Sequence, residues 1–137
     1  MLKCDSGKGG IVMNAVVTVK SREKLLKARA GAILLPKIVG FAFGNGGADV
    51  DGNVISPDEK QVELNSELLR KNIDNYTITS DTTCRYECTL AENELVGEKI
   101  SEIALYDAEG DLVAIKNFTP KGKDSDIAMT FLIDDVF

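Results

Sequence analysis

The chain has 137 residues, enough for one globular domain that buries a core without disulfides or metals. It contains no histidine, which excludes histidine-based acid–base catalysis and histidine-containing metal sites. Its net charge of −6 makes it a poor nucleic-acid binder, and no apolar run is long enough to span a membrane. We therefore expect neither nucleic acid nor membrane among its partners.

The charge is unevenly distributed along the chain. Residues 1–37 hold eight basic and two acidic side chains, whereas residues 38–137 hold eight basic and twenty acidic ones. Such polarity can guide head-to-tail contacts or contacts with a partner. It is also compatible with an ordinary solvated surface of mixed charge.

Residues 1–12 look like a translated leader. Lys8-Gly9-Gly10 can be encoded by a purine run identical to a bacterial ribosome-binding site, and Ile11-Val12 supply the usual gap before a start codon. We expect Met13 to be the biological start, residues 1–12 to be disordered and residues 13–137 to form a single domain. No secretory signal peptide is recognisable.

The first predicted elements are a short strand or extended arm over residues 14–20 and a helix over residues 22–30. Ser21 is the expected N-cap of this helix, and Gly31 is expected to end it. Its basic face, formed by Lys20, Arg22, Lys24, Lys27 and Arg29, either docks an acidic partner or is simply solvated.

A buried strand is predicted over residues 38–43, ending in a glycine-rich turn at residues 44–47 and a polar loop to Ile55. Ser56-Pro57-Asp58-Glu59 is typical of a helix start, with a capping serine, proline at the first helical position and glutamate three residues after the cap. We expect this helix to continue to Lys71.

The C-terminal half alternates apolar and polar residues, which predicts strands over residues 84–90, 100–106, 112–118 and 127–133. Asp107 to Gly110 is expected to form a tight hairpin turn. The pattern predicts an α+β fold: an antiparallel sheet or small sandwich, with a C-terminal meander and one or two helices in the N-terminal half.

The three cysteines are Cys4, Cys84 and Cys88. An odd number argues against a disulfide framework. Cys84 and Cys88 are expected on one strand about 13 Å apart, at ~3.3 Å per residue, which is too far for a bridge. We interpret Cys88 as a buried structural residue rather than a nucleophile, because no histidine base exists to activate it.

Other candidate sites are weak. Residues 47–54 resemble part of a calcium loop, with Asp49, Asp51 and Asp58 at ligand positions, but the bidentate glutamate is missing. The turn at residues 44–47 lacks the Gly-Lys-Ser/Thr of a phosphate loop. Glu92 and Glu94 show no mark of a catalytic pair. We therefore predict no catalytic, cofactor-binding or metal-binding residue and no enzymatic activity.

Three stretches carry a resemblance to a known family: Thr18–Gly31, Leu35–Gly47 and Ile100–Ala114. The third is similar to a hairpin pattern Ile-x-Glu-Ile-Gly-Leu-Phe/Tyr-Asp followed by Gly-x-Leu, with Ala104 in place of the usual glycine. Leu64–Lys71 fits a Leu-x-x-Glu-x-x-Arg stretch loosely. In order and spacing the chain resembles the N-terminal domain of phage tail-collar fibre proteins.

This resemblance implies a structural module of a phage, prophage or tail-like particle that attaches a tail fibre to the baseplate or collar. It implies a homo-oligomer, with a trimer favoured, and a baseplate or tail protein or a distal fibre chain as partner. It also implies assembly in the bacterial cytoplasm and a final location in the virion tail. Because the chain reaches only Phe137, it is expected to be a stand-alone adaptor, a fibre whose distal part lies on another chain, or a prophage remnant.

Two other functions stay open from the residues alone. A receptor- or carbohydrate-binding module needs exposed aromatic side chains for stacking, and the chain has three Tyr, five Phe and no Trp. An enzyme is disfavoured by the weak candidate sites described above.

Overall fold

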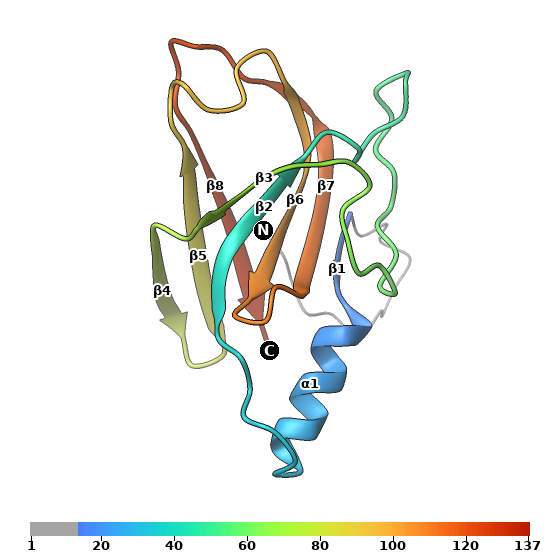
Figure 1. Cartoon of the computed structure of the whole chain (residues 1–137), viewed down its shortest axis with the longest axis vertical. Coiled ribbons are helices and arrows are strands. Elements are labelled where there is room, and N and C mark those ends of the chain that lie inside the picture. Colours follow the sequence, from blue (N-terminus) through green and yellow to red (C-terminus); the bar gives the residue numbers. More distant parts are fainter. Residues whose placement is uncertain (1–13) are drawn as a thin grey trace.

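A computed structural model of the chain describes residues 14–137, which form a single helix and eight strands. The predicted leader, residues 1–12, and its boundary at Met13 lie outside the described residues. The elements are β1 (Ala15–Val17), α1 (Val19–Arg29), β2 (Ile38–Gly44), β3 (Glu67–Asn72), β4 (Asn75–Ser80), β5 (Thr83–Leu90), β6 (Lys99–Asp107), β7 (Leu112–Gly122) and β8 (Met129–Val136). Figure 1 shows the strands gathered in one body and the helix beside it, which confirms the α+β class. No helix among residues 14–137 is long and apolar enough to cross a membrane.

The strands form two antiparallel sheets, one of order β1-β7-β6-β2-β3 and one of order β4-β5-β8. The four strands predicted in the C-terminal half are present, but the meander is wrong, because β5 pairs with β8 whereas β6 pairs with β7. The chain crosses from one sheet to the other after β3, after β5 and again after β7. This arrangement places the apolar sides of both sheets against each other, as in a sandwich.

The five-stranded sheet is buried on both faces. Phe41 and Phe43 on β2 point into a core shared with the three-stranded sheet, where Phe43 meets Phe131 edge to face with ring centroids 5.2 Å apart. Ala42 and Ala104 point the opposite way, into a second apolar cluster that Leu64 completes. Burial on both sides explains why β2 is apolar at consecutive positions, as strands covered on two faces usually are.

The helix predicted between Ser56 and Lys71 is wrong. Asp58 accepts the N–H of Lys60 in a local turn, and the Glu59 carbonyl oxygen accepts the N–H of Val19 at 2.7 Å, so no capping box forms at Ser56. The chain then enters strand β3, which pairs with β2. The free edge of β2 offers backbone partners and a core for the leucines of β3, and this outweighs the local helical signal.

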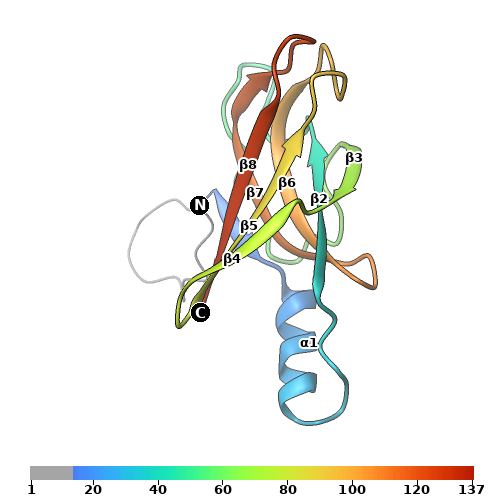
Figure 2. The ribbon, with the colours of Figure 1, turned by 90° about the vertical axis from the view of Figure 1, so that its left-hand side faces the viewer.

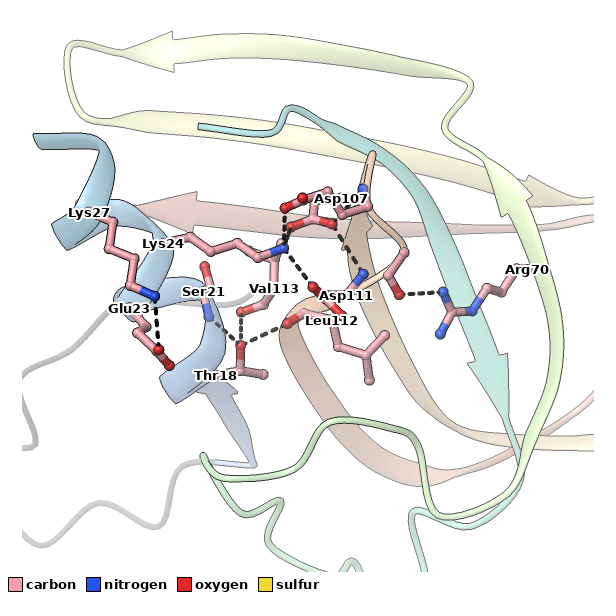
Figure 3. Close-up of polar contacts among 12 residues, drawn as sticks. Thr18, Ser21, Glu23, Lys24, Lys27, Arg70, Asp107, Asp111, Leu112 and Val113 are labelled. Atoms are coloured by element: carbon pink, nitrogen blue, oxygen red, sulfur yellow. Dashed lines mark hydrogen bonds and ion pairs between the residues drawn. The ribbon is translucent and has the colours of Figure 1, made fainter. Parts of the chain in front are cut away.

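The N-terminal helix is confirmed, but its start is earlier than predicted. It begins at Val19, and its N-cap is Thr18 rather than Ser21. The Thr18 hydroxyl accepts the N–H of Ser21 at 3.1 Å and donates to the carbonyl oxygen of Leu112 at 2.7 Å. One side chain therefore caps the helix and joins it to β7 (Figure 3).

Candidate docking surface

Helix α1 and the return segment 30–37 form an arm that projects past one end of the sandwich (Figures 1 and 2). The far end of this arm exposes apolar side chains: Leu26 is 68% exposed and Leu34 is 93% exposed. Ile33, Leu34 and Leu35 follow one another in the return segment, and all three are exposed. Consecutive exposed apolar residues at a projecting tip are typical of a surface that is covered by a partner.

One buried lysine fixes the direction of the arm. The Nζ atom of Lys24 lies 2.7 Å from an Asp107 carboxylate oxygen, 2.7 Å from one of Asp111 and 2.9 Å from one of Glu109, all three on the β6–β7 turn (Figure 3). Burial lowers the pKa of Lys24, but its hydrogen bonds to Asp107, Asp111 and Glu109 outweigh burial and raise that pKa above the usual lysine range. The hydrogen bond from Lys24 holds the pKa of Asp111 below its usual range. We call this cluster the Lys24 clamp.

Three carboxylates that lie close together can form a metal site, but here the Lys24 clamp supplies a different cation. Asp107, Glu109 and Asp111 bring oxygen atoms within 4.8 Å of one another, close enough to share a cation. That cation is the ammonium group of Lys24, which lies within 2.9 Å of all three. The cluster therefore acts as a structural joint. Sequence reasoning missed it, because Lys24 and Asp107 are 83 positions apart.

The carboxylates of the calcium-like loop serve backbone turns. Asp49 accepts the N–H groups of Asn53 and Asp51, each at 2.9 Å, and these hydrogen bonds lower the pKa of Asp49. Asp58 is engaged in a separate turn with Lys60. The side chains of Asp49 and Asp58 thus stabilise their own segments of loop, in keeping with the interpretation as a polar surface loop.

The glycine-rich turn after β2 is occupied by side chains of β6. The N–H of Gly46 donates to Glu102 and the N–H of Gly47 donates to the hydroxyl of Ser101, each at 2.8 Å. Glu102 is fully buried and also accepts the N–H groups of Asn65 and Ser66. The donors that a phosphate loop would offer to a ligand are therefore committed to the fold.

Cys84 and Cys88 are free thiols on β5, as predicted, and Cys88 is fully buried. Burial raises the pKa of Cys88 to about 12, so the reactive thiolate is not populated near neutral pH. Glu94 forms an ion pair with Lys71 at 2.6 Å, and that hydrogen bond lowers the pKa of Glu94. These contacts are structural, and Cys4 lies outside the described residues.

An apolar groove of about 820 Å³ runs between the base of the arm and the three-stranded sheet. Its sheet wall includes Tyr76 and Ile78 on β4, which pair with Tyr86 and Cys84 on β5. Residues paired across antiparallel strands share a face, and Tyr86 also pairs with Ile133 of the core. Tyr76 and Ile78 therefore lie on the core-facing side of the sheet, yet they are 59% and 72% exposed.

A buried carboxylate lies in this groove. Asp135 of β8 is only 8% exposed and lines both the groove and the adjoining pocket against α1. Among residues 14–137 no hydrogen bond or ion pair reaches its carboxylate, although the carboxylate oxygens are not among the fully enclosed unpaired atoms, of which Asn117 Oδ1 is the one found there. Burial raises the pKa of Asp135. An apolar groove holding an unpaired buried acid is suited to an apolar segment that brings a cation. The sequence did not predict this groove, because β4 has no clear alternation of apolar and polar residues.

The described residues thus form a β-sandwich whose conspicuous surface features are an arm and a groove, as in a structural module that assembles with other chains. Residues 12–130 match the family model described as phage tail-collar fibre protein, N-terminal, and the chain belongs to this family. Comparisons with curated proteins and with solved structures give no match. The family confirms the resemblance seen in the sequence and identifies the chain as a structural domain of a phage tail fibre, a component of the virion tail.

The stretches that carried the resemblance meet at the base of the arm. Thr18–Gly31 forms α1 and its end, Leu35–Gly47 forms the return and β2, and Ile100–Ala114 forms most of β6, the turn and the start of β7. The Lys24 clamp joins the first of these stretches to the third. The quoted motifs therefore specify an arm joined to a sandwich by the Lys24 clamp.

Proposed function

We propose that this domain attaches a tail fibre to the baseplate or collar of a phage or prophage particle, and that it does so as a closed homo-oligomer, with a trimer favoured. The partner is a baseplate or tail protein on one side and a distal fibre chain on the other. The observation that supports this proposal is the projecting arm. Its base is held by the Lys24 clamp, and its far end exposes Leu26, Ile33 and Leu34. An attachment module needs such a surface, and the family supports a role in the fibre.

The charge of the arm supports a docking role. Residues 19–37 hold six basic side chains and one acidic side chain in a chain that is acidic overall. Lys24 and Arg22 pair with residues of the sandwich and the loop, whereas Arg29 has no ion pair within residues 14–137. A surface of this kind favours encounter with acidic partners and speeds association.

Reconstitution on particles tests the attachment. Particles produced without this chain should lack the fibre, and adding the purified full chain together with the distal fibre should restore fibres seen by electron microscopy. A variant with Leu34→Glu should fail to restore them, and Val62→Glu, which changes a similarly exposed residue of the loop, should restore them. Fibres present in normal number without the chain would contradict the proposal.

A receptor- or carbohydrate-binding role is the second candidate, because Tyr76 is exposed at the groove and Asp135 lies beside it. An aromatic face with a nearby hydrogen-bonding acid is a common way to hold a sugar. A glycan array with the full chain tests this role. Selective binding that Tyr76→Ala abolishes would favour this function over fibre attachment.

A further inference from the structure

The arm tip, residues 29–34, and the groove are two exposed apolar surfaces of the same chain. The tip presents Leu34 and Ile33 beside Arg29, whereas the groove presents Tyr76 and Ile78 beside Asp135. One surface is an exposed apolar segment with a cation, and the other is an exposed apolar wall beside a carboxylate that has no ion-pair partner within residues 14–137. The groove lining also includes Lys37, so the match rests on the apolar surfaces and on Asp135.

Geometry keeps the end of α1, with Arg29, away from the groove of its own molecule. Helix α1 has 11 residues, which at ~1.5 Å per residue holds the tip roughly 16 Å beyond the helix start. Figure 2 shows the helix pointing away from the sandwich, with the tip at the far end. The Lys24 clamp and the cap at Thr18 fix the helix in that direction. Only the base of the return segment, near Leu35, reaches the groove.

Arg29 is the cation best placed to meet Asp135. Of the other basic residues on α1, Lys24 is held in the clamp, Arg22 pairs with Glu59 and Lys27 pairs with Glu23, whereas Lys20 lies at the helix start, away from the tip. Arg29 lies at the end of the helix next to the apolar tip and makes no ion pair within residues 14–137. A guanidinium group can form a bidentate ion pair with a carboxylate, and this pairing compensates for the free-energy cost of removing both groups from water.

We propose that the arm tip of one copy of this chain inserts into the groove of a second copy, with Arg29 pairing with Asp135 and Leu34 covering Tyr76 and Ile78. The inference rests on the proposed self-association and specifies the surface that makes it. Because the tip and the groove are different surfaces, the contact is head-to-tail, and it closes when a ring of copies returns to the first.

Mixing two variants tests this contact directly. Leu34→Glu in the full chain places a charge on the apolar tip and leaves the groove unchanged. Ile78→Glu places a charge on the groove wall and leaves the tip unchanged. Each variant alone should be monomeric by light scattering after size exclusion. An equal mixture should form a one-to-one complex, because the first variant still offers a groove and the second still offers a tip.

The controls separate lost contact from lost folding. Both side chains are already exposed, so the thermal unfolding midpoint of each variant should stay close to that of the wild type. Val62→Glu changes an exposed residue of the loop between β2 and β3 and should leave the oligomer unchanged. Lys20→Gln removes a charge from the other end of α1 and should also leave it unchanged.

A second pair of variants tests the ion pair. Arg29→Gln and Asp135→Asn should each weaken self-association by roughly tenfold or more, and the double variant should be no weaker than the single ones, because they remove the same interaction. Additive losses would contradict the Arg29 pairing.

Three results would overturn the proposal: a monomeric wild type at high concentration, a mixture that stays monomeric, or loss of assembly with Leu34→Glu but not with Ile78→Glu. The last result would indicate contact between two tips. None of these results bears on whether the domain sits at the fibre attachment point, which the comparison of particles with and without the wild-type chain tests separately.

Discussion

Lys24 shows how one residue sets the shape of this domain. Its aliphatic stem crosses from α1 to the sandwich, and its ammonium group joins three carboxylates of the β6–β7 turn. A buried pair of this kind contributes little net free energy compared with an apolar contact, but removing one partner is costly because the other charge stays buried. Its main role is therefore to fix the orientation of the arm.

Replacing Lys24 tests that role. Lys24→Met should lower the free energy of unfolding by about 2 kcal/mol, because it leaves the buried Asp107 carboxylate without its cation. Urea unfolding followed by circular dichroism measures the change. The control is Lys27→Met on the same helix, which breaks an exposed pair with Glu23 and should cost less than about 0.5 kcal/mol. Equal effects of the two variants would contradict the clamp.

The clamp should also be visible in the pH dependence of stability. The pKa of Asp111 is lowered in the folded state, so its contribution is present above the ordinary carboxyl range and lost as pH falls through the folded pKa. The pKa of Lys24 is raised, so its contribution is complete below 10.5 and is lost only as pH rises further. The difference between wild type and Lys24→Met should be constant from about pH 5 to pH 9 and shrink below about pH 4. A difference that grows on acidification would contradict this.

At the scale of elements, the long loop between β2 and β3 is held by one glutamate. Glu102 accepts three backbone N–H groups, from Gly46 at the start of the loop and from Asn65 and Ser66 at its end. The loop in turn covers the second apolar cluster through Leu64. The segment of this loop that was predicted to be helical is thus held by contacts that are 36 and 37 positions distant in sequence.

Gly47 tests how tightly this loop is packed. A Cβ atom at Gly47 would overlap the backbone carbonyl of Ser101, so Gly47→Ala should cost about 3 kcal/mol, as overpacking against backbone does. Gly122→Ala is the matched control, because a Cβ there meets nothing within 4 Å and should change stability by under about 1 kcal/mol. Thermal and urea unfolding of both variants give the comparison. A tolerated alanine at position 47 would mean that the turn is looser than described.

Local patterns predicted the elements whose partners are near in sequence or whose alternation is strict. The β6–β7 hairpin was predicted because Asp107 to Gly110 forms a tight turn, and Gly110 indeed has a positive φ of 87°. Strand β4 was missed because all its residues are exposed and its apolar side chains face a groove instead of a core. The clamp and the position of Asp135 depend on pairings over long sequence distances, which no local pattern encodes.

At the scale of the whole molecule, the uneven charge of the sequence acquires a structural meaning. The basic N-terminal region includes the arm, and the acidic remainder forms the sandwich with the groove. A chain that is basic at its projecting arm and acidic in its sandwich is suited to head-to-tail association.

Self-association should therefore weaken as salt is raised from about 0.1 M to about 1 M, because the Debye length falls from about 10 Å to about 3 Å. Light scattering at both salt concentrations measures this, and a salt-independent mass would argue for a purely apolar contact.

The most direct test of the fibre-attachment role is to locate the domain on the particle. Gold-labelled Fab fragments raised against the full chain can be bound to purified particles and imaged by electron microscopy. We expect the gold at the root of the fibres, where they meet the baseplate or collar. Gold at the distal tips of the fibres would contradict attachment and favour a receptor-binding role.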